Sequence, residues 1–208
     1  MQALPNVWDD VFRDHGHVFA EPHDAMPGIA QALHEGGGRS LLDLGSGTGR
    51  HVVYFARQGF ATFGIDIAPE GLRLTQQWLA SEGLTAGLCR QNLMAGLPYR
   101  DASFDALVSV QVMHHAPIAV IRDLIGEMAR VLVPGELVFV SVAKNRGQAR
   151  EYREIEPGTL VPLDGWEVGL PHHFFTPDEL RDEFVPFFTV SDVYIDSVDH
   201  YCLLGHRK

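Results

Sequence analysis

Residues 41–50 read LLDLGSGTGR, and this stretch decides the fold. Apolar residues and one acid, Asp43, lead directly into three alternating glycines, Gly45, Gly47 and Gly49. Glycine allows a tight turn and leaves no Cβ atom in the path of a ligand. In an open parallel sheet, the turn after the first strand lies at the carboxyl edge, where ligands bind. The stretch therefore predicts a strand, a ligand-binding loop and the start of a helix.

The spacing of these glycines differs from that of a dinucleotide-binding loop. That fingerprint is G-x-G-x-x-G, whereas counting from Gly45 places Arg50 at the sixth position and leaves G-x-G-x-G. Asp43 would repel a pyrophosphate in a poorly solvated pocket, and it suits a ligand with a positive amino group. An NAD(P)-dependent oxidoreductase is therefore the disfavoured alternative.

Short apolar runs alternate with helical patterns on both sides of the loop. The predicted strands occupy 40–44, 61–67, 86–90, 103–110 and 137–143, and the predicted helices occupy 25–34, 50–59, 68–83 and 117–131. This alternation predicts right-handed crossovers and a doubly wound, mainly parallel α/β sheet.

The last part of the chain breaks this rhythm. Residues 144–175 show too little periodicity for a long element, and Thr176 with Glu179 predicts a capped helix start. Two closing strands, 187–195 and 200–207, are close enough to form an antiparallel hairpin. The hairpin brings the expected sheet to seven strands.

Further motifs extend the pattern beyond the glycine loop. FGIDI (63–67) ends the second predicted strand with an acid, RQNLMAGLPYRDASFDALVSVQVMHH (90–115) contains the fourth strand, and EMARVLVPGELVFVS (127–141) joins a helix, a proline–glycine turn and a strand. In this order they resemble the class I S-adenosylmethionine-dependent methyltransferases over about 39–142. The overall plan is similar to the small-molecule members grouped with tellurite-resistance and quinone-biosynthesis methyltransferases.

The resemblance implies S-adenosyl-L-methionine as cofactor and methyl transfer to a small molecule as activity. A module that binds this cofactor without catalysis is a further alternative. In the family, the loop holds the methionine part, the acid before it lies near the amino group, and the acid of the second strand holds the ribose hydroxyls. The cofactor-binding residues so implied are Asp43, Gly45, Ser46, Gly47, Gly49, Asp66, Ile67, Asn92, Leu93 and Gln111.

One of these positions departs from the family pattern. Asn92 stands where the family commonly has an aspartate that accepts a hydrogen bond from the adenine amine. An amide oxygen can accept the same bond without a charge. We therefore expect adenine recognition to survive with slightly altered affinity.

Two histidine pairs are candidates for chemistry. His114 and His115 follow the fourth predicted strand, whereas His172 and His173 lie in PHHFFTPDEL, which resembles a segment near the reactive end of the cofactor. Neighbours on a strand point to opposite faces, so at most one of each pair is expected to face the pocket. Because a base is needed only for an acceptor protonated at working pH, His115 and His173 are candidate bases only. No local spacing such as H-E-x-x-H occurs, and no metal site is expected.

Aromatic residues flank the predicted core on both sides. We expect Trp8, Phe12 and His15 to form a lid over the methionine end, the alternative being that these aromatics fix a helix onto the sheet. Tyr152, Trp166 and His172 are expected on the acceptor side. One domain is predicted, with a lid segment, a cofactor-binding core, an acceptor-side insert and a closing helix and hairpin at 1–38, 39–143, 144–175 and 176–208.

Charge favours a small-molecule acceptor over a nucleic acid. The formal net charge is −11, and a protein that neutralises phosphates needs clustered Lys and Arg. The basic residues are scattered apart from one group, interpreted as solvated surface, at Lys144, Arg146, Arg150 and Arg153.

Other features predict a cytoplasmic protein without a membrane partner. No apolar run has the length of a membrane span, and the start of the sequence does not resemble a secretory signal. The two cysteines, Cys89 and Cys202, are expected to be free thiols. A monomer and a homodimer fit the sequence equally.

Overall fold

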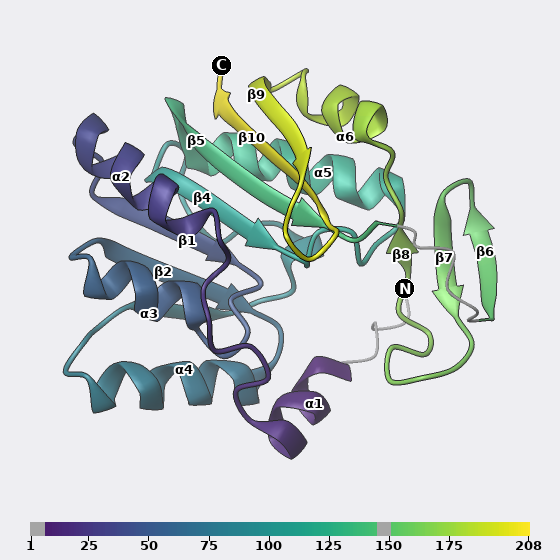
Figure 1. Ribbon diagram of the computed structural model, residues 1–208, viewed down its shortest axis with the longest axis horizontal. Coiled ribbons are helices and arrows are strands. Elements are labelled where there is room, and N and C mark those ends of the chain that lie inside the picture. Colours follow the sequence, from purple (N-terminus) through teal and green to yellow (C-terminus); the bar gives the residue numbers. More distant parts are fainter. Residues whose placement is uncertain (1–6, 145–150) are drawn as a thin grey trace.

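A seven-stranded sheet lies between two layers of helices (Figure 1). The computed structural model describes residues 7–144 and 151–208. The strands of the central sheet are β1 (Ser40–Leu44), β2 (Ala61–Asp66), β3 (Gly87–Arg90), β4 (Phe104–Val110), β5 (Leu132–Val142), β9 (Phe188–Ile195) and β10 (Tyr201–Arg207). The helices are α1 (Val7–His15), α2 (Met26–Gly36), α3 (Arg50–Arg57), α4 (Pro69–Ser81), α5 (Ile118–Val131) and α6 (Pro177–Phe184), with a short 3₁₀ helix, η1 (Leu93–Ala95).

The strand order confirms the predicted doubly wound sheet. It runs β3-β2-β1-β4-β5-β10-β9, with β1 parallel to both β2 and β4. β10 runs antiparallel to β5 and to β9, as the predicted hairpin requires. The order reverses between β1 and β4, and ligands of such sheets bind at the carboxyl edge beside this switch point.

Alternation along the buried strands produces one apolar core on each face. Leu42 and Leu44 of β1 belong to the core covered by α5 and α6, whereas Leu41 belongs to the core covered by α2 and α3. All three leucines are 0% exposed. Because α2 packs into this second core, it is not placed to act as a lid, whereas Trp8 and Phe12 of α1 line the cavity, as do Phe19 and His23 after it.

The predicted start of α6 is confirmed. The Glu179 backbone N–H donates to Thr176 Oγ1 at 3.1 Å, and the Thr176 N–H donates to Glu179 Oε2 at 3.4 Å. This reciprocal capping box satisfies two backbone donors at the helix start. It fixes where the chain re-enters regular structure after the insert.

The insert holds short strands where the sequence predicted no long element. β6 (Tyr152–Glu156), β7 (Thr159–Pro162) and β8 (His172–His173) form an antiparallel sheet of their own. Strands this short leave hardly any alternation to detect in a sequence. The His173 N–H donates to the His114 carbonyl at 2.8 Å, which ties this sheet to the loop after β4.

Three further predictions concern single features. Cys89 and Cys202 are free, as predicted. Among residues 7–144 and 151–208, no helix is both long and apolar enough to cross a bilayer. Of the basic group in the insert, Arg146 and Arg150 lie outside the described residues.

Candidate functional site

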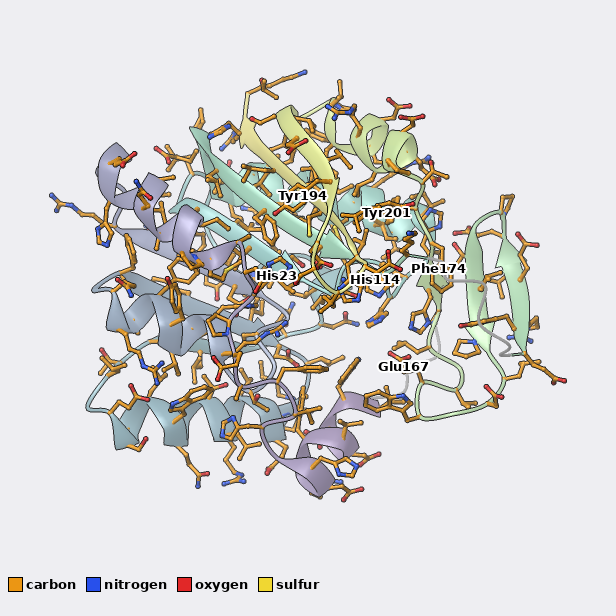
Figure 2. The ribbon with its side chains drawn as sticks, viewed as in Figure 1. His23, His114, Glu167, Phe174, Tyr194 and Tyr201 are labelled. Carbon is orange, nitrogen blue, oxygen red and sulfur yellow. The ribbon has the colours of Figure 1, made fainter. Side chains whose placement is uncertain are left out.

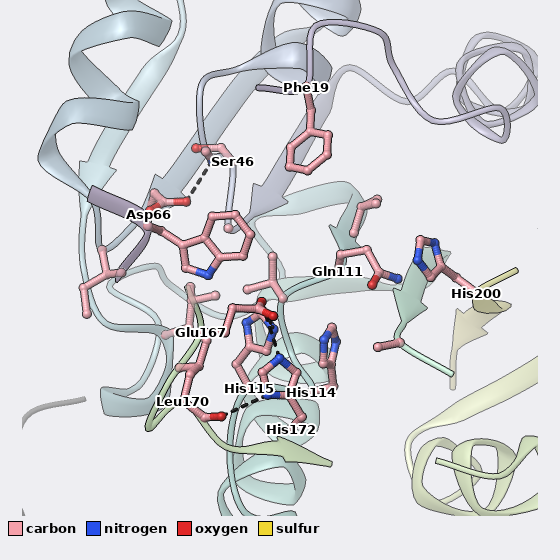
Figure 3. A pocket seen from close by; sticks show the side chains of 18 of the residues that line it. Phe19, Ser46, Asp66, Gln111, His114, His115, Glu167, Leu170, His172 and His200 are labelled. Atoms are coloured by element: carbon pink, nitrogen blue, oxygen red, sulfur yellow. Dashed lines mark hydrogen bonds and ion pairs between the residues drawn. The ribbon is translucent and has the colours of Figure 1, made fainter. Parts of the chain in front are cut away.

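A cavity of about 620 Å³ opens at the carboxyl edge of the sheet, beside the switch point (Figure 3). Its walls come from the glycine loop, the ends of β2 and β4, helix α1, the insert and the β9–β10 loop. Figure 2 shows His23 and His114 near the strand ends and Glu167 below them, beyond the sheet edge. Segments far apart in sequence therefore share one cavity.

The glycine loop is shaped so that side chains cannot replace its glycines. Gly45 has φ +73°, and a Cβ atom there would lie 2.3 Å from Val112 Cγ2. Gly49 has φ +91°, and its Cβ atom would lie 2.5 Å from Thr75 Cγ2. Gly45, Ser46 and Gly47 line the cavity, whereas Gly49 is not among the lining residues. Gly49 thus serves the packing of the loop on α4.

Asp66 joins the end of β2 to the glycine loop. Its Oδ2 accepts the Gly47 N–H at 2.8 Å, and its Oδ1 accepts the Ala68 N–H at 2.8 Å. Burial raises the pKa of this carboxyl to about 6, against the lowering effect of these backbone hydrogen bonds. Asp66 and Ile67 both line the cavity, as the sequence predicted for residues in contact with a cofactor.

Asp43 lies behind the loop and does not line the cavity wall. Its side chain is 1% exposed, and its Oδ2 lies 3.7 Å from His51 Nδ1. Neither this oxygen nor Ser46 Oγ has a hydrogen-bond partner among the described residues. Because a buried polar atom without a partner costs stability, Ser46 Oγ, in a residue that lines the cavity, marks a place where a ligand's polar group would be favoured.

The residues expected at the adenine end are in place, with one difference. Asn92 and Leu93 line the cavity, but Asn92 Oδ1 accepts the Met94 N–H at 3.0 Å and caps η1. The Asn92 side chain therefore holds the start of η1 through the Met94 backbone. Gln111 also lines the cavity, and it has a left-handed φ of +61° while its side chain donates to Ser141 Oγ at 2.7 Å.

Helix α1 and the insert meet across the cavity. The rings of Trp8 and Trp166 lie edge to face with centroids 5.6 Å apart, and Trp8 also stacks on His115 at 6.2 Å. Phe12 lies against Gly47, and Tyr152 lines the insert side. His15 does not line the cavity. Trp8, Phe12, Tyr152 and Trp166 thus line one cavity, from helix α1 and from the insert.

The two histidine pairs behave differently. Both His114 and His115 line the cavity, so the expectation of one per pair is wrong here. Strand alternation does not apply to them because they follow β4 in a turn. In β8 the rule holds, since His172 lines the cavity and His173 does not. His173 instead contacts Thr159 Oγ1 at 2.8 Å and Glu179 Oε1 at 3.2 Å, which joins the insert to α6.

Protonation of these rings is set by burial. Burial, with a smaller effect of His172, lowers the pKa of His115 to about 3. Burial also lowers the pKa of His114 well below its usual value. His115 is thus neutral at physiological pH, and a group with so low a pKa is a weak general base.

Several lining residues carried no signal in the sequence. His23, His51, His200 and Glu167 reach the cavity from four different segments. They lie outside the motifs, and only the folded chain brings them to the strand ends. His51 is the nearest to a motif, since it directly follows Arg50.

Comparisons with known proteins agree on the family. A family model described as a methyltransferase domain matches residues 41–135. The bovine (Bos taurus) probable tRNA methyltransferase 9B is 32% identical over 74% of this chain, and the ubiquinone biosynthesis O-methyltransferase of Caulobacter vibrioides is 29% identical over 74% of it. The chain belongs to the class I S-adenosylmethionine-dependent methyltransferases.

The chain covers only part of the length of these two relatives. The chain spans 32% of the length of the bovine relative and 60% of the Caulobacter one. A solved structure, the 1,6-didemethyltoxoflavin-N1-methyltransferase of Burkholderia thailandensis, aligns over 97% of this chain and 88% of that one, with a TM-score of 0.68 and 20% identity. This likeness shows that the methyltransferase fold extends over nearly the whole chain.

The cavity fits S-adenosylmethionine, the cofactor of these methyltransferases. In the cradle of Gly45 and Gly47 the backbone itself lines the cavity, since a Cβ atom there would meet Val112 and Phe12, and Ser46 Oγ has no hydrogen-bond partner among the described residues. Asp66 presents a buried carboxylate beside the cradle. We therefore expect the loop to hold the amino-acid part of the cofactor and Asp66 to hold its ribose hydroxyls.

Proposed function

We propose that this methyltransferase methylates a small molecule bound between the glycine loop and the insert. One observation carries the proposal: a single cavity joins the cofactor loop to a wall of Trp8, Trp166 and histidines. Its volume of about 620 Å³ is in the range of sites for small ligands. The acceptor would lie against this aromatic wall and the cofactor against the loop.

The bound cofactor supplies an activated methyl group on a sulfonium sulfur. The residues of the chain then have to position the acceptor and keep water out of the cavity. Trp8 and Trp166 suit the exclusion of water because their rings meet across the cavity. The low pKa of His115 suits an acceptor that arrives as an anion or a free amine, since neither needs a strong base.

Charge and enclosure support a small acceptor over a nucleic acid. A net charge of −11 opposes a phosphate backbone. Two of the similar proteins are named for small molecules, ubiquinone and 1,6-didemethyltoxoflavin, whereas the bovine relative is named for tRNA. An RNA acceptor is therefore the competing outcome of the experiment below.

The experiment combines a binding measurement with an acceptor screen. Calorimetry with S-adenosylhomocysteine should show one site in the wild type and at least tenfold weaker binding in Asp66→Ala. Labelled methyl from the cofactor should then reach a member of a panel of phenols, quinols, thiols and amines, and not bulk tRNA. Transfer to tRNA alone would overturn the small-molecule acceptor.

Two further outcomes separate the alternatives. Binding without transfer to any acceptor would indicate a non-catalytic module. Quenching of NADH fluorescence together with no binding of S-adenosylhomocysteine would indicate an oxidoreductase. The Thr176→Ala variant, changed at the cap of α6, controls for a general loss of stability.

A further inference from the structure

Three histidines converge on one point of the cavity wall, opposite the glycine loop. His114, His115 and His172 each offer a ring nitrogen, and the three atoms lie within 4.8 Å of one another. Figure 3 shows these rings gathered with Glu167, well apart from Ser46 and Phe19. The sequence predicted no metal site because no local spacing exists, but folding supplies the convergence from the turn after β4 and from β8.

Glu167 completes the group with a carboxylate. Its Oε1 lies 3.4 Å from His172 Nε2 and 3.9 Å from His115 Nε2. In a tetrahedral zinc site with bonds of about 2.0–2.1 Å, neighbouring ligand atoms are roughly 3.4 Å apart. The distances from Glu167 to His172 and His115 are therefore close to those around a shared ion, whereas the three ring nitrogens lie within the wider limit of 4.8 Å.

The hydrogen bond made by Nδ1 of His172 determines which of its two ring nitrogens can bind a metal ion. His172 Nδ1 lies 2.9 Å from the Leu170 carbonyl oxygen, to which it donates. The lone pair is then on Nε2, which points towards Glu167. A histidine that ligates a metal usually donates its other N–H to a carbonyl or carboxylate in this way.

Crowding makes these rings suitable ligands. His114 and His115 lie with ring centroids 4.2 Å apart, and His115 and His172 lie 4.7 Å apart. His114 Nδ1 is buried without a hydrogen-bond partner among the described residues. A bound cation would give this nitrogen the partner that it lacks.

In a second cluster of possible metal ligands, the side chains are already bonded to one another. His23, Asp196 and Cys202 also lie within 4.8 Å, but His23 Nε2 and Asp196 Oδ2 share a hydrogen bond of 3.0 Å. Burial raises the pKa of the Cys202 thiol to about 12, so this sulfur is not a thiolate and binds metal poorly. This cluster provides an internal comparison for the first.

We propose that His114, His115, His172 and Glu167 form a site for one divalent transition-metal ion of the zinc or cobalt class. Three imidazoles and a carboxylate suit such an ion, and zinc held by four protein atoms can take an acceptor atom by expanding to five-coordinate. The site faces the cavity, so the ion would bind an anionic oxygen or sulfur of the acceptor. This role for the ion rests on the proposed function, whereas the binding itself does not.

The test is a Co²⁺ titration of protein stripped with a chelator, followed by visible absorption and by calorimetry. We expect one Co²⁺ per chain, displaced by Zn²⁺. His172→Ala should weaken Co²⁺ binding at least 100-fold, and Glu167→Gln should weaken it about tenfold. Cys202→Ser, which alters the second cluster, and His34→Ala, an exposed histidine, should leave it unchanged.

The outcomes distinguish this proposal from the proposed function. S-adenosylhomocysteine binding is measured on each sample without metal, and circular dichroism checks folding. No saturable Co²⁺ binding in a sample that binds S-adenosylhomocysteine would overturn the metal site alone, as would equal binding by wild type and His172→Ala. If His172→Ala fails to fold, His115→Ala and Glu167→Gln decide in its place. Co²⁺ binding without S-adenosylhomocysteine binding would overturn the proposed function alone.

Discussion

The Asp66 carboxylate accepts the backbone N–H of Gly47 at 2.8 Å, which links the end of β2 to the cofactor loop. Burial of the carboxyl costs stability because it raises the pKa to about 6, above its ordinary 3.8, although the backbone hydrogen bonds lower the pKa in part. The ionised carboxylate therefore destabilises the fold above pH 6, and the cost disappears as the pH falls below 3.8. A buried acid kept at such a cost is a mark of a functional position.

Cofactor binding should follow the ionisation of Asp66. Only the ionised carboxylate can accept from Gly47 and from ribose hydroxyls together. Affinity for S-adenosylhomocysteine should thus be about tenfold lower at pH 5 than at pH 8. Calorimetry over this range, in buffers with different ionisation enthalpies, measures both the affinity and the proton released.

The control for this pH dependence is Asp66→Asn. The variant should bind weakly at every pH, because its amide cannot accept from both Gly47 and Ala68. A wild-type affinity that is flat between pH 5 and pH 8 would contradict the role given to Asp66. His115 does not interfere, since its pKa of about 3 lies below this range.

Gly45→Ala should unfold more easily and lose cofactor binding. The new methyl group would lie within 3 Å of Val112, and the backbone has φ +73°. We expect a loss of about 3 kcal/mol in the free energy of unfolding, measured with urea. Gly59→Ala is the matched control, because Gly59 has φ +86° with nothing within 4 Å. It should lose about 1 kcal/mol and retain binding.

Tryptophan fluorescence should report cofactor binding in the cavity. The chain has three tryptophans, of which Trp8 and Trp166 line the cavity and Trp78 does not. Adding S-adenosylhomocysteine should change the emission of the wild type and of Trp78→Phe, but hardly that of a Trp8→Phe, Trp166→Phe double variant. An equal response from all three proteins would show that these rings do not sense the cofactor.

Asp196→Ala should destabilise the fold strongly. The Asp196 carboxylate is 3% exposed, and it accepts from His23 at 3.0 Å and from the backbone N–H groups of His200 and Val198. Removing it leaves the buried His23 ring without this acceptor and also frees the His200 and Val198 N–H groups, at an expected cost of about 3 kcal/mol in the free energy of unfolding. Asp10→Ala, with a side chain 73% exposed, breaks an ion pair at the surface and should cost less than about 1 kcal/mol.

The sequence predicted the central sheet well because its strands carry strong local signals. The predicted strand 40–44 coincides with β1, since apolar residues are bounded there by polar residues and glycines. β6, β7 and β8 were missed because strands of five, four and two residues carry no clear alternation.

The candidate site divides in the same way. Gly45, Gly47 and Asp66 belong to motifs, and each lies at the cavity. Glu167 and His23 belong to no motif, and no local pattern could place them there. Long-range contacts position such residues, and a single sequence contains no record of these contacts.

The backbone bond from His173 to His114 has a consequence for how this enzyme can change. A main-chain link survives replacement of either side chain. The insert can therefore keep its position beside the loop after β4 while its side chains vary. Mutations in the insert could therefore redirect the enzyme to new acceptors and leave the half that holds the nucleoside intact. Such a division of labour offers evolution a route to new specificity without loss of methyl-donor binding.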